Sequence, residues 1–247
     1  MDKIKLTQVV NAGLLIEGSG RKILIDGIHN VKTPEWSTVD NNLMNYIIYG
    51  KGRFKDINYL LFTHQHEDHF NIEKTLEYME NNKVEKLVAT KLNSAVLKNS
   101  GILHELDGNY YELGTINPEN ILIKYIRTKH LSHERFGIDH YAFIIGINNK
   151  TILFSGDADY TKSEYAEALK SVRIDVIVAP FIMANSEFGR TFVRKVSPSL
   201  LILNHLPNKE DDEYNYTRMA ERNVARHLNE LPETIIFQNL FDEVIIE

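Results

Sequence analysis

The amino-acid sequence contains no cysteine among its 247 residues. Without cysteine there is no disulfide bond, thiolate metal ligand or cysteine nucleophile, so any catalytic or metal site must use other side chains. The 6 prolines and 13 glycines are too few for a collagen-like or low-complexity chain. No apolar run reaches about 18 residues, and the N-terminal apolar runs are too short for a signal peptide. We therefore expect a cytoplasmic protein that does not contact a membrane.

Basic residues are in the minority, with 28 Lys and Arg against 34 Asp and Glu, and the net charge is −6. Because nucleic acids and anionic membranes attract basic surfaces, this balance argues against a nucleic-acid partner and favours a small-molecule substrate. Arg190, Arg194 and Lys195 could meet a phosphate or carboxylate, but we expect them on a solvated helix face. The sequence predicts no oligomeric state.

Short apolar runs separated by turn residues predict a chain rich in strands, with helices between them. Strands are expected at residues 4–10, 14–17, 22–26, 58–63, 86–90, 121–128, 141–147, 151–155, 175–179, 200–204, 233–237 and 243–246. Helices are expected at residues 38–49, 72–81, 91–98, 161–170 and 211–231. Because no linker rich in Ser, Gly or Pro divides the chain, we predict a single domain over residues 1–247. Each half is first strand-rich and then mixed, which suggests two facing sheets with helices outside.

Residues 27–56 depart from this alternation and are expected to leave the scaffold. They contain Trp36, Tyr46 and Tyr49 around one short helical stretch. These aromatic residues could close over a bound ligand as a lid, or they could simply pack the segment onto the body of the protein. Both interpretations are open at this point.

The most informative segment is THQHEDH, residues 63–69, which includes the end of an apolar strand. His64 and His66 leave the same face of an extended chain, because strand side chains alternate. Asp68 and His69 then lie at the start of a helix and can reach a second point nearby. Imidazole nitrogen and carboxylate oxygen suit Zn²⁺, Fe or Mn²⁺ and do not select among them. The cluster therefore predicts a metal site.

Three further candidate ligands come after predicted strands, namely His130, Asp157 and His205. Gly156 would permit a tight turn before Asp157. The carboxyl ends of strands commonly carry the functional groups of α/β proteins. Each of the three residues has a simpler explanation when taken alone, as a polar residue at a strand end. Together with THQHEDH they supply seven ligands for two metal ions, with one carboxylate available between the ions.

These motifs resemble the metallo-β-lactamase-fold hydrolase superfamily. THQHEDH matches its His-x-His-x-Asp-His motif, and NAGLLIEG, KILID, the strand-end histidine, the Gly-Asp pair and the late strand-His follow in the family's order, over about residues 4–210. The resemblance implies an α/β fold, a four-layer αββα sandwich of two mixed β-sheets with helices on the outside. The layout is most similar to the ascorbate-6-phosphate lactonase-like and general metal-dependent hydrolase branch. That branch acts on lactones, phosphodiesters and other small esters.

The resemblance also implies two divalent metal ions at one edge of the paired sheets. We expect Zn²⁺, with Mn²⁺ or Fe as alternatives. The implied ligands are His64, His66 and His130 for one ion, Asp68, His69 and His205 for the other, and Asp157 for both. Asp26, at the end of KILID, could orient a ligand histidine or could form a turn with Gly27.

The segment RTKHLSHERFGIDH offers three candidates for the third histidine of the first ion. His130 directly follows the strand, as the family pattern expects, and is our prediction. His133 is the alternative, and His140 at the start of the next strand could contact substrate instead. Three histidines have no such context and are expected only at the surface or in packing contacts: His29, His104 and His227.

The implied activity is hydrolysis by a hydroxide that two metal ions activate. Asp68 could also orient the hydroxide and take its proton, which makes it the predicted catalytic residue. The retained His66 argues against the flavodiiron branch of the fold, which has Glu at that position. We predict a metal-dependent hydrolase that cleaves a small ester, lactone or phosphodiester. The alternatives are an iron-dependent redox enzyme on the same fold and a non-catalytic metal-binding module.

Overall fold

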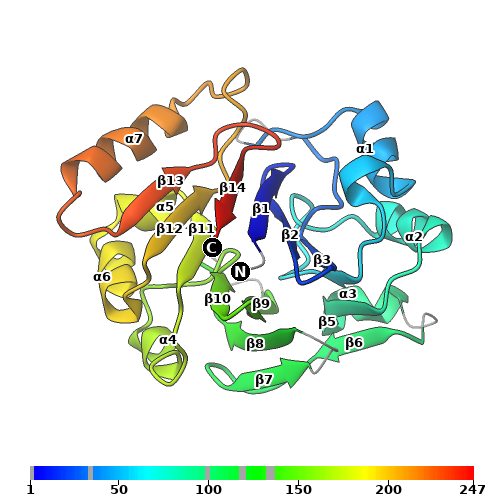
Figure 1. Cartoon of the computed structure of the whole chain (residues 1–247), viewed down its shortest axis with the longest axis horizontal. Coiled ribbons are helices and arrows are strands. Elements are labelled where there is room, and N and C mark those ends of the chain that lie inside the picture. The colour runs from blue at the N-terminus through cyan, green and yellow to red at the C-terminus, as the bar shows by residue number, and fades with distance from the viewer. Residues whose placement is uncertain (1–2, 33–35, 98–100, 117–120, 132–136) are drawn as a thin grey trace.

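The computed structural model describes residues 3–32, 36–97, 101–116, 121–131 and 137–247. In these ranges the strands form two seven-stranded sheets that face each other, and helices cover their outer faces (Figure 1). The predicted four-layer αββα sandwich of two mixed sheets is therefore confirmed.

Both sheets combine antiparallel hairpins with parallel strands. The first sheet contains, in spatial order, β14 (Glu243–Ile246), β1 (Ile4–Val9), β2 (Gly13–Gly18), β3 (Arg21–Ile25), β4 (Tyr59–Leu61), β5 (Lys86–Thr90) and β6 (Leu103–Leu106). The second contains β13 (Glu233–Ile236), β12 (Leu200–Asn204), β11 (Val176–Pro180), β10 (Lys150–Phe154), β9 (His140–Ile147), β8 (Leu122–Thr128) and β7 (Leu113–Ile116). The hairpin between β9 and β10 turns at Asn148 and Asn149, which both have positive φ, as a two-residue type I′ turn requires.

Helices lie on the outer side of each sheet. Those of the first half are α1 (Asn41–Ile48), the short 3-10 helix η1 (Gly52–Phe54), α2 (Ile72–Asn81) and α3 (Lys91–Leu97). Those of the second half are α4 (Ser163–Ala168), α5 (Ile182–Asn185), α6 (Glu187–Val196) and α7 (Tyr216–Arg226). Within the described ranges, no helix combines the length and the apolar character needed to cross a membrane.

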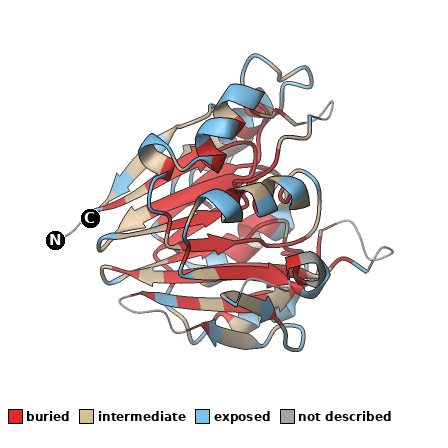
Figure 2. Cartoon of the chain, turned by 90° about the vertical axis from the view of Figure 1, so that its right-hand side faces the viewer, coloured by how far each residue is buried: buried red, intermediate tan, exposed pale blue. Residues whose placement is uncertain are grey.

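The alternation of side chains along each strand divides the apolar residues among layers. In β2, Leu14 and Ile16 lie between the sheets, whereas Leu15 packs beneath α1 and α2. In β9, Phe143 lies between the sheets and Ile144 packs on the helix side. Because both faces of each sheet are covered, the central strands are apolar at nearly every position. Figure 2 shows this buried interior between exposed outer helices and sheet edges.

The direction of the strands determines where functional side chains gather. In the first sheet β1, β3 and β4 run the same way, because β1 and β3 are both antiparallel to β2 and β3 is parallel to β4. In the second sheet β8, β10 and β12 share one direction for the same reasons. Their carboxyl ends therefore form a rim on each sheet. The residues that emerge there are Asn11, Asp26, His64, His130, Asp157 and His205.

Some elements differ from the sequence-based expectation. The helix expected at residues 211–231 is shorter, because the Asp212 carboxylate accepts hydrogen bonds from the backbone N–H groups of Tyr216 and Thr217 and so begins α7 there. β6 and β7 lack a continuous apolar run, so their sequences do not indicate strands. The last strand, β14, pairs with β1 and completes the first sheet.

The segment 27–56 leaves the sheets as expected. Its helix α1 buries an apolar face against the outer side of the first sheet, while Tyr46 and Tyr49 remain exposed. Of Trp36, Tyr46 and Tyr49, Trp36 is the one that reaches the functional rim, where its ring centroid lies 4.3 Å from that of His205. Packing therefore accounts for α1, and a lid at Trp36 stays a prediction.

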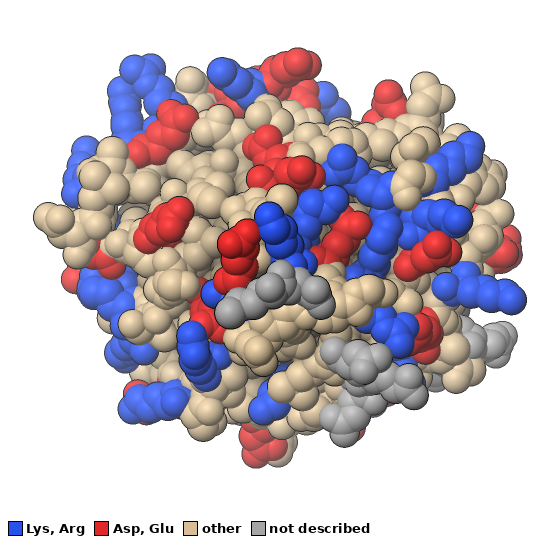
Figure 3. Space-filling model, viewed as in Figure 1, with Lys and Arg blue, Asp and Glu red and all other residues tan. Residues whose placement is uncertain are grey.

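Charged side chains of both signs are mixed on the surface. Figure 3 shows Lys and Arg interspersed with Asp and Glu on one face of the molecule. Several are paired, as Lys5 is with Glu17 at 2.8 Å and Arg127 with Asp139 at 3.0 Å. On this face acidic side chains therefore lie among the basic ones, which gather mainly on the right of the view.

We expect the layer between the sheets to dominate stability. Phe143 is fully buried there, so Phe143→Ala should lower the free energy of unfolding by about 3–5 kcal/mol, which denaturant titration would measure. Leu228→Ala is the control, because this leucine is 67% exposed and its truncation should change stability by less than about 0.5 kcal/mol. Equal effects of the two substitutions would contradict the assigned core.

Candidate metal centre

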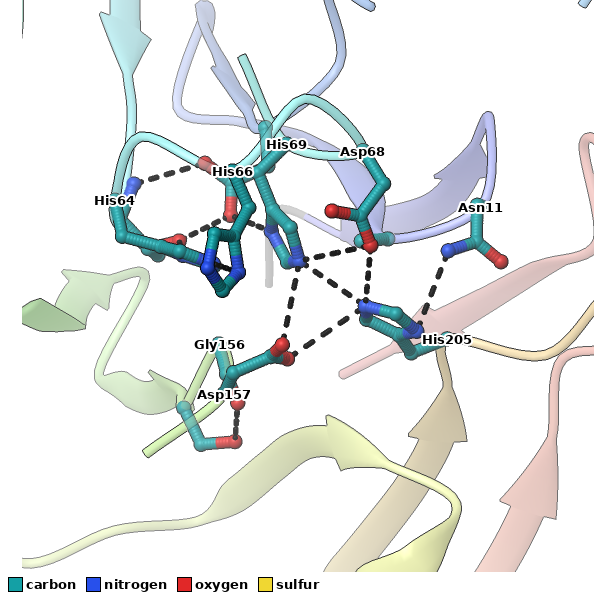
Figure 4. Close-up of polar contacts among 12 residues, drawn as sticks. Asn11, His64, His66, Asp68, His69, Gly156, Asp157 and His205 are labelled. Atoms are coloured by element: carbon teal, nitrogen blue, oxygen red, sulfur yellow. Dashed lines mark hydrogen bonds and ion pairs between the residues drawn. The ribbon is translucent and has the colours of Figure 1, made fainter. Parts of the chain in front are cut away.

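The seven predicted ligands converge where the rims of the two sheets meet. Figure 4 labels all of them except His130. Two groups form, and within each the candidate ligand atoms lie within 4.8 Å of one another. The first group consists of His64, His66, His130 and Asp157, and the second consists of Asp68, His69 and His205. This division matches the assignment that the sequence motifs imply.

The first group joins the loop after β4 to loops of the second sheet. His64 Nε2 lies 3.0 Å from His66 Nδ1, and His130 Nε2 lies 3.4 Å from Asp157 Oδ2. The backbone holds the last two residues together, because His130 forms an isolated β-bridge with Ala158. The backbone N–H of Leu131 also donates to the carbonyl of Asp157 at 2.8 Å. These bonds bring His130 toward His64 and His66.

The second group is equally close. His69 Nε2 lies 3.0 Å from His205 Nε2, and Asp68 Oδ2 lies 3.4 Å from His205 Nε2 and 3.7 Å from His69 Nε2. Asp68 and His69 come from a tight turn, in which the backbone N–H of His69 donates to the carbonyl of His66, just before α2 begins. The predicted placement at a helix start is therefore correct.

Asp157 touches both groups. Its Oδ2 lies 3.4 Å from His130 Nε2 and 3.6 Å from His69 Nε2, and its Oδ1 lies 3.6 Å from His205 Nε2. The turn before it depends on Gly156, whose φ is +48°. A Cβ at Gly156 would lie 2.8 Å from His140 Nε2, so this position needs glycine for both its conformation and its space.

Asp26 contacts one of the candidate ligands, as the first of its two predicted roles requires. Its Oδ2 lies 2.9 Å from His69 Nδ1, and its Oδ1 accepts a hydrogen bond from the backbone N–H of Thr63 at 2.8 Å. With Nδ1–H donating to Asp26, His69 directs Nε2 toward His205 and the carboxylates, and once Nε2 loses its proton its lone pair is available to a metal. A carboxylate behind a histidine commonly sets the ring orientation at metal sites in this way.

Two further contacts that orient candidate ligand histidines are not predicted from the sequence. The side-chain amide of Asn11 lies 3.3 Å from His205 Nδ1, although the two residues are 194 positions apart. Thr63 Oγ1 lies 2.9 Å from His64 Nδ1. The only available signal for Asn11 was its place in NAGLLIEG, directly after β1.

The other histidines have different surroundings. His140 is buried beside His64, with ring centroids 5.1 Å apart, and its Nδ1 contacts Thr128 Oγ1 at 2.7 Å. It lies outside both ligand groups, and His133 lies outside the described residues. His29 is fully buried, and burial lowers its pKa to about 3. Two histidines lie away from the site, His104 against Tyr125 and His227 hydrogen-bonded to Glu230.

The protonation states suit metal binding. Burial, together with the neighbouring His69, holds the pKa of His64 well below its usual value. Burial lowers the pKa of His66 to about 4. Burial acts to raise the pKa of Asp157, but His205 and His69 lower it more strongly, to well below its usual value. At neutral pH His64 and His66 are therefore neutral imidazoles and Asp157 is an ionised carboxylate, which are the forms that bind metals.

The donor set fits a pair of divalent cations. In each group two imidazole nitrogens approach each other to 3.0 Å, His64 with His66 in one loop and His69 with His205 across the two sheets. Two such nitrogens that both lack a proton would repel each other unless a cation lay between them. Asp157 Oδ1 is buried without a hydrogen-bond donor among the described residues. Buried polar atoms normally have a partner, and a cation between these atoms would supply one.

A cavity of about 240 Å³ opens beside both groups. His66, Asp68 and Asp157 contribute polar atoms to its wall. The full lining is Trp36, His66, Asp68, His130, Leu131, Asp157, Ala158, Tyr160, Pro180, Phe181, Ile182 and His205. A small molecule in this cavity would therefore contact the candidate metal ligands directly.

Comparisons with known proteins agree with this architecture. The family model described as "Beta-lactamase superfamily domain" matches residues 5–202. Among curated proteins, none matches this sequence.

Solved structures resemble the whole chain. Igni18, a metallo hydrolase from Ignicoccus hospitalis, is 17% identical with a TM-score of 0.66, over 99% of both chains. The isothiocyanate hydrolase from Delia radicum gut bacteria is 15% identical with a TM-score of 0.67, over 97% of this chain and 98% of that one. CmlA, a diiron β-hydroxylase from Streptomyces venezuelae, is 13% identical with a TM-score of 0.68, over 99% of this chain but only 54% of its own. At these identities the likeness concerns the fold.

Removal of one candidate ligand should remove metal. We expect His66→Ala to contain at least one metal ion fewer per chain than the wild type, measured by elemental analysis after dialysis, because the first group then loses a nitrogen donor. His227→Gln is the control, since this histidine contacts Glu230 and lies outside both groups. Unchanged metal content in His66→Ala would overturn the assignment.

Metal uptake at the second group should release a proton. Burial alone would lower the pKa of His69, but the carboxylates of Asp157, Asp68 and Asp26 raise it more strongly. The pKa of His69 therefore lies well above its usual value. His69 is then protonated in the metal-free protein at pH 7, and a metal must displace that proton. Affinity should therefore strengthen as pH rises, because protonation competes less.

Titration calorimetry in two buffers of different ionisation enthalpy would count the released protons. We expect about one proton from the second group at pH 7. Asp26→Asn should reduce that number, because the variant lacks one of the carboxylates that stabilise the charged ring. Metal affinity that weakens as pH rises from 6 to 8 would contradict this account.

Proposed function

Because the chain belongs to the β-lactamase superfamily, we propose that it is a metal-dependent hydrolase that uses two divalent ions to cleave a small ester, lactone or phosphodiester. The observation that carries this proposal is the contact of Asp157 with histidines of both donor groups beside an open cavity. Five imidazoles and two carboxylates without sulfur form a donor set that suits hydrolytic metals.

In this proposal each group would hold one ion, and Asp157 would contact both. The ligands would be His64, His66 and His130 for one ion and Asp68, His69 and His205 for the other. When bound, the ions would supply a hydroxide nucleophile near neutral pH and stabilise the negative charge that develops on the substrate. Zn²⁺ is the expected metal, and Mn²⁺ or Fe would fit the same donors.

Asp68 has a second role in the proposal. Its carboxylate lines the cavity and is partly exposed, while Oδ2 lies 3.4 Å from His205 Nε2. Burial raises its pKa, but His69 and His205 lower it more strongly, so Asp68 is ionised at neutral pH. An ionised carboxylate at the cavity wall can orient a water molecule and accept its proton. Asp26 and Asn11 would hold His69 and His205 in place behind it.

An iron-dependent redox enzyme is the second candidate. The sulfur-free set of imidazole and carboxylate donors also suits iron. One protein of similar fold, CmlA, is a diiron β-hydroxylase. The identity of the metal and the consumption of oxygen would distinguish this candidate from a hydrolase. A purely metal-binding module is less well supported, because the donors face a cavity that a substrate can enter.

Activity should depend on the metal. We expect the Zn²⁺- or Mn²⁺-loaded protein to hydrolyse at least one member of a panel of p-nitrophenyl esters, lactones, thioesters and bis-p-nitrophenyl phosphate. Chelation should abolish turnover, and added metal should restore it. His227→Gln should behave as the wild type. Undiminished turnover after complete metal removal, or none on the whole panel at full occupancy, would refute the proposed hydrolase. Stoichiometric iron with oxygen consumption would instead support the redox candidate.

A further inference from the structure

Two chemically distinct sets of residues line the cavity beside the candidate metal centre. The candidate ligands His66, Asp68, His130, Asp157 and His205 form the polar side. The rest of the lining, here called the apolar side, is mainly apolar and aromatic and consists of Trp36, Leu131, Ala158, Tyr160, Pro180, Phe181 and Ile182. A substrate whose reacting group meets the candidate ligands therefore places its remaining atoms against these apolar residues.

The apolar side offers little hydrogen bonding to a ligand. The hydroxyl of Tyr160 donates to the carbonyl of Ile182 at 3.3 Å. The ring of Trp36 lies edge-on to His205 and stacks on Tyr216. Sugar hydroxyls or amides placed against this wall would lose water without gaining partners, which costs free energy. The wall therefore favours aliphatic or aromatic groups.

No lysine or arginine lines the cavity in the described part of the chain. Nearby cations contact other groups: Lys32 lies 3.1 Å from Asp211, and Lys162 lies 3.7 Å from Asp159. Arg190 is buried, not solvated as the sequence suggested, and donates to the carbonyls of Ala184 and Asn185. Among the described lining residues, an anionic group away from the reacting centre would therefore find no lysine or arginine partner.

The size of the cavity limits the apolar group. Its volume is about 240 Å³, and an apolar protein cavity of about 150 Å³ holds one benzene molecule. Part of the space must take the reacting carbonyl and its attacking water. The remainder fits an aliphatic chain of about four to six carbons or one ring.

From these observations, and resting on the proposed function, we propose that the substrate is an uncharged carboxylic ester, thioester or lactone with a short apolar acyl group. Water oxygen forms a bond to the carbonyl carbon, and the bond from that carbon to the ester oxygen or thioester sulfur breaks. The leaving group takes one proton from water and the other is released, so the products are a carboxylate, an alcohol or thiol, and H⁺. A lactone gives the same groups on one molecule.

A chain-length series tests this proposal. We expect kcat/KM of the metal-loaded protein on p-nitrophenyl esters to rise about fourfold per methylene from acetate to about hexanoate and then to fall. Bis-p-nitrophenyl phosphate should be a poorer substrate than the hexanoate ester. Ile182→Ser should lower the hexanoate-to-acetate ratio at unchanged metal content, because Ile182 lines the cavity. Leu228→Ser, at an exposed position, should leave the ratio unchanged.

Trp36 provides a readout that needs no turnover, because it lines the cavity and is the only tryptophan of the chain. Hexanamide, an uncharged analogue, should change its fluorescence at lower concentration than acetamide or diethyl phosphate does. Faster hydrolysis of the phosphodiester, or rates independent of chain length, would overturn the substrate class and leave the hydrolase intact. Absence of all turnover would refute the proposed function, and hexanamide binding no tighter than acetamide would refute the apolar site separately.

Discussion

Asp157 is the residue on which the proposed site depends, because its carboxylate contacts histidines from both sheets. It follows β10 of the second sheet, whereas His69 comes from the loop after β4 of the first. Buried carboxylates and imidazoles this close together are costly to desolvate unless each finds a partner. A cation between them would supply that partner, and binding to the folded state alone would add to its stability.

The scaffold supports this arrangement through the direction of its strands. Side chains that follow parallel-running strands emerge at the same rim, so ligands far apart in sequence meet without long loops. A further shell of contacts then orients the rings: Asp26 behind His69, Asn11 behind His205, and Thr63 beside His64. Such contacts limit ring rotation and so preserve the geometry that the chemistry needs.

Sequence reasoning succeeds where the signal is local. The THQHEDH motif and the apolar strands indicate the candidate ligand groups and the sandwich, because side-chain spacing along a strand or at a helix start is a short-range property. Sequence reasoning does not predict the placement of residues whose position depends on contacts with distant parts of the chain. Asn11 meets His205 across 194 positions, and Trp36 reaches the rim from a segment that otherwise packs elsewhere. The apolar cavity wall depends on the short helix α5, which no sequence pattern indicated.

In the proposed enzyme the reaction takes place at the imidazoles and carboxylates, and the apolar residues of the same cavity select the substrate. This proposal predicts a specific metal geometry. Its central claim is that two metal ions lie on either side of Asp157. The most direct measurement is anomalous X-ray scattering from crystals of the metal-loaded protein, recorded at the absorption edge of the bound metal. The account predicts two anomalous peaks, one within each donor group and both beside the Asp157 carboxylate. No peak there, or a single peak remote from Asp157, would contradict it.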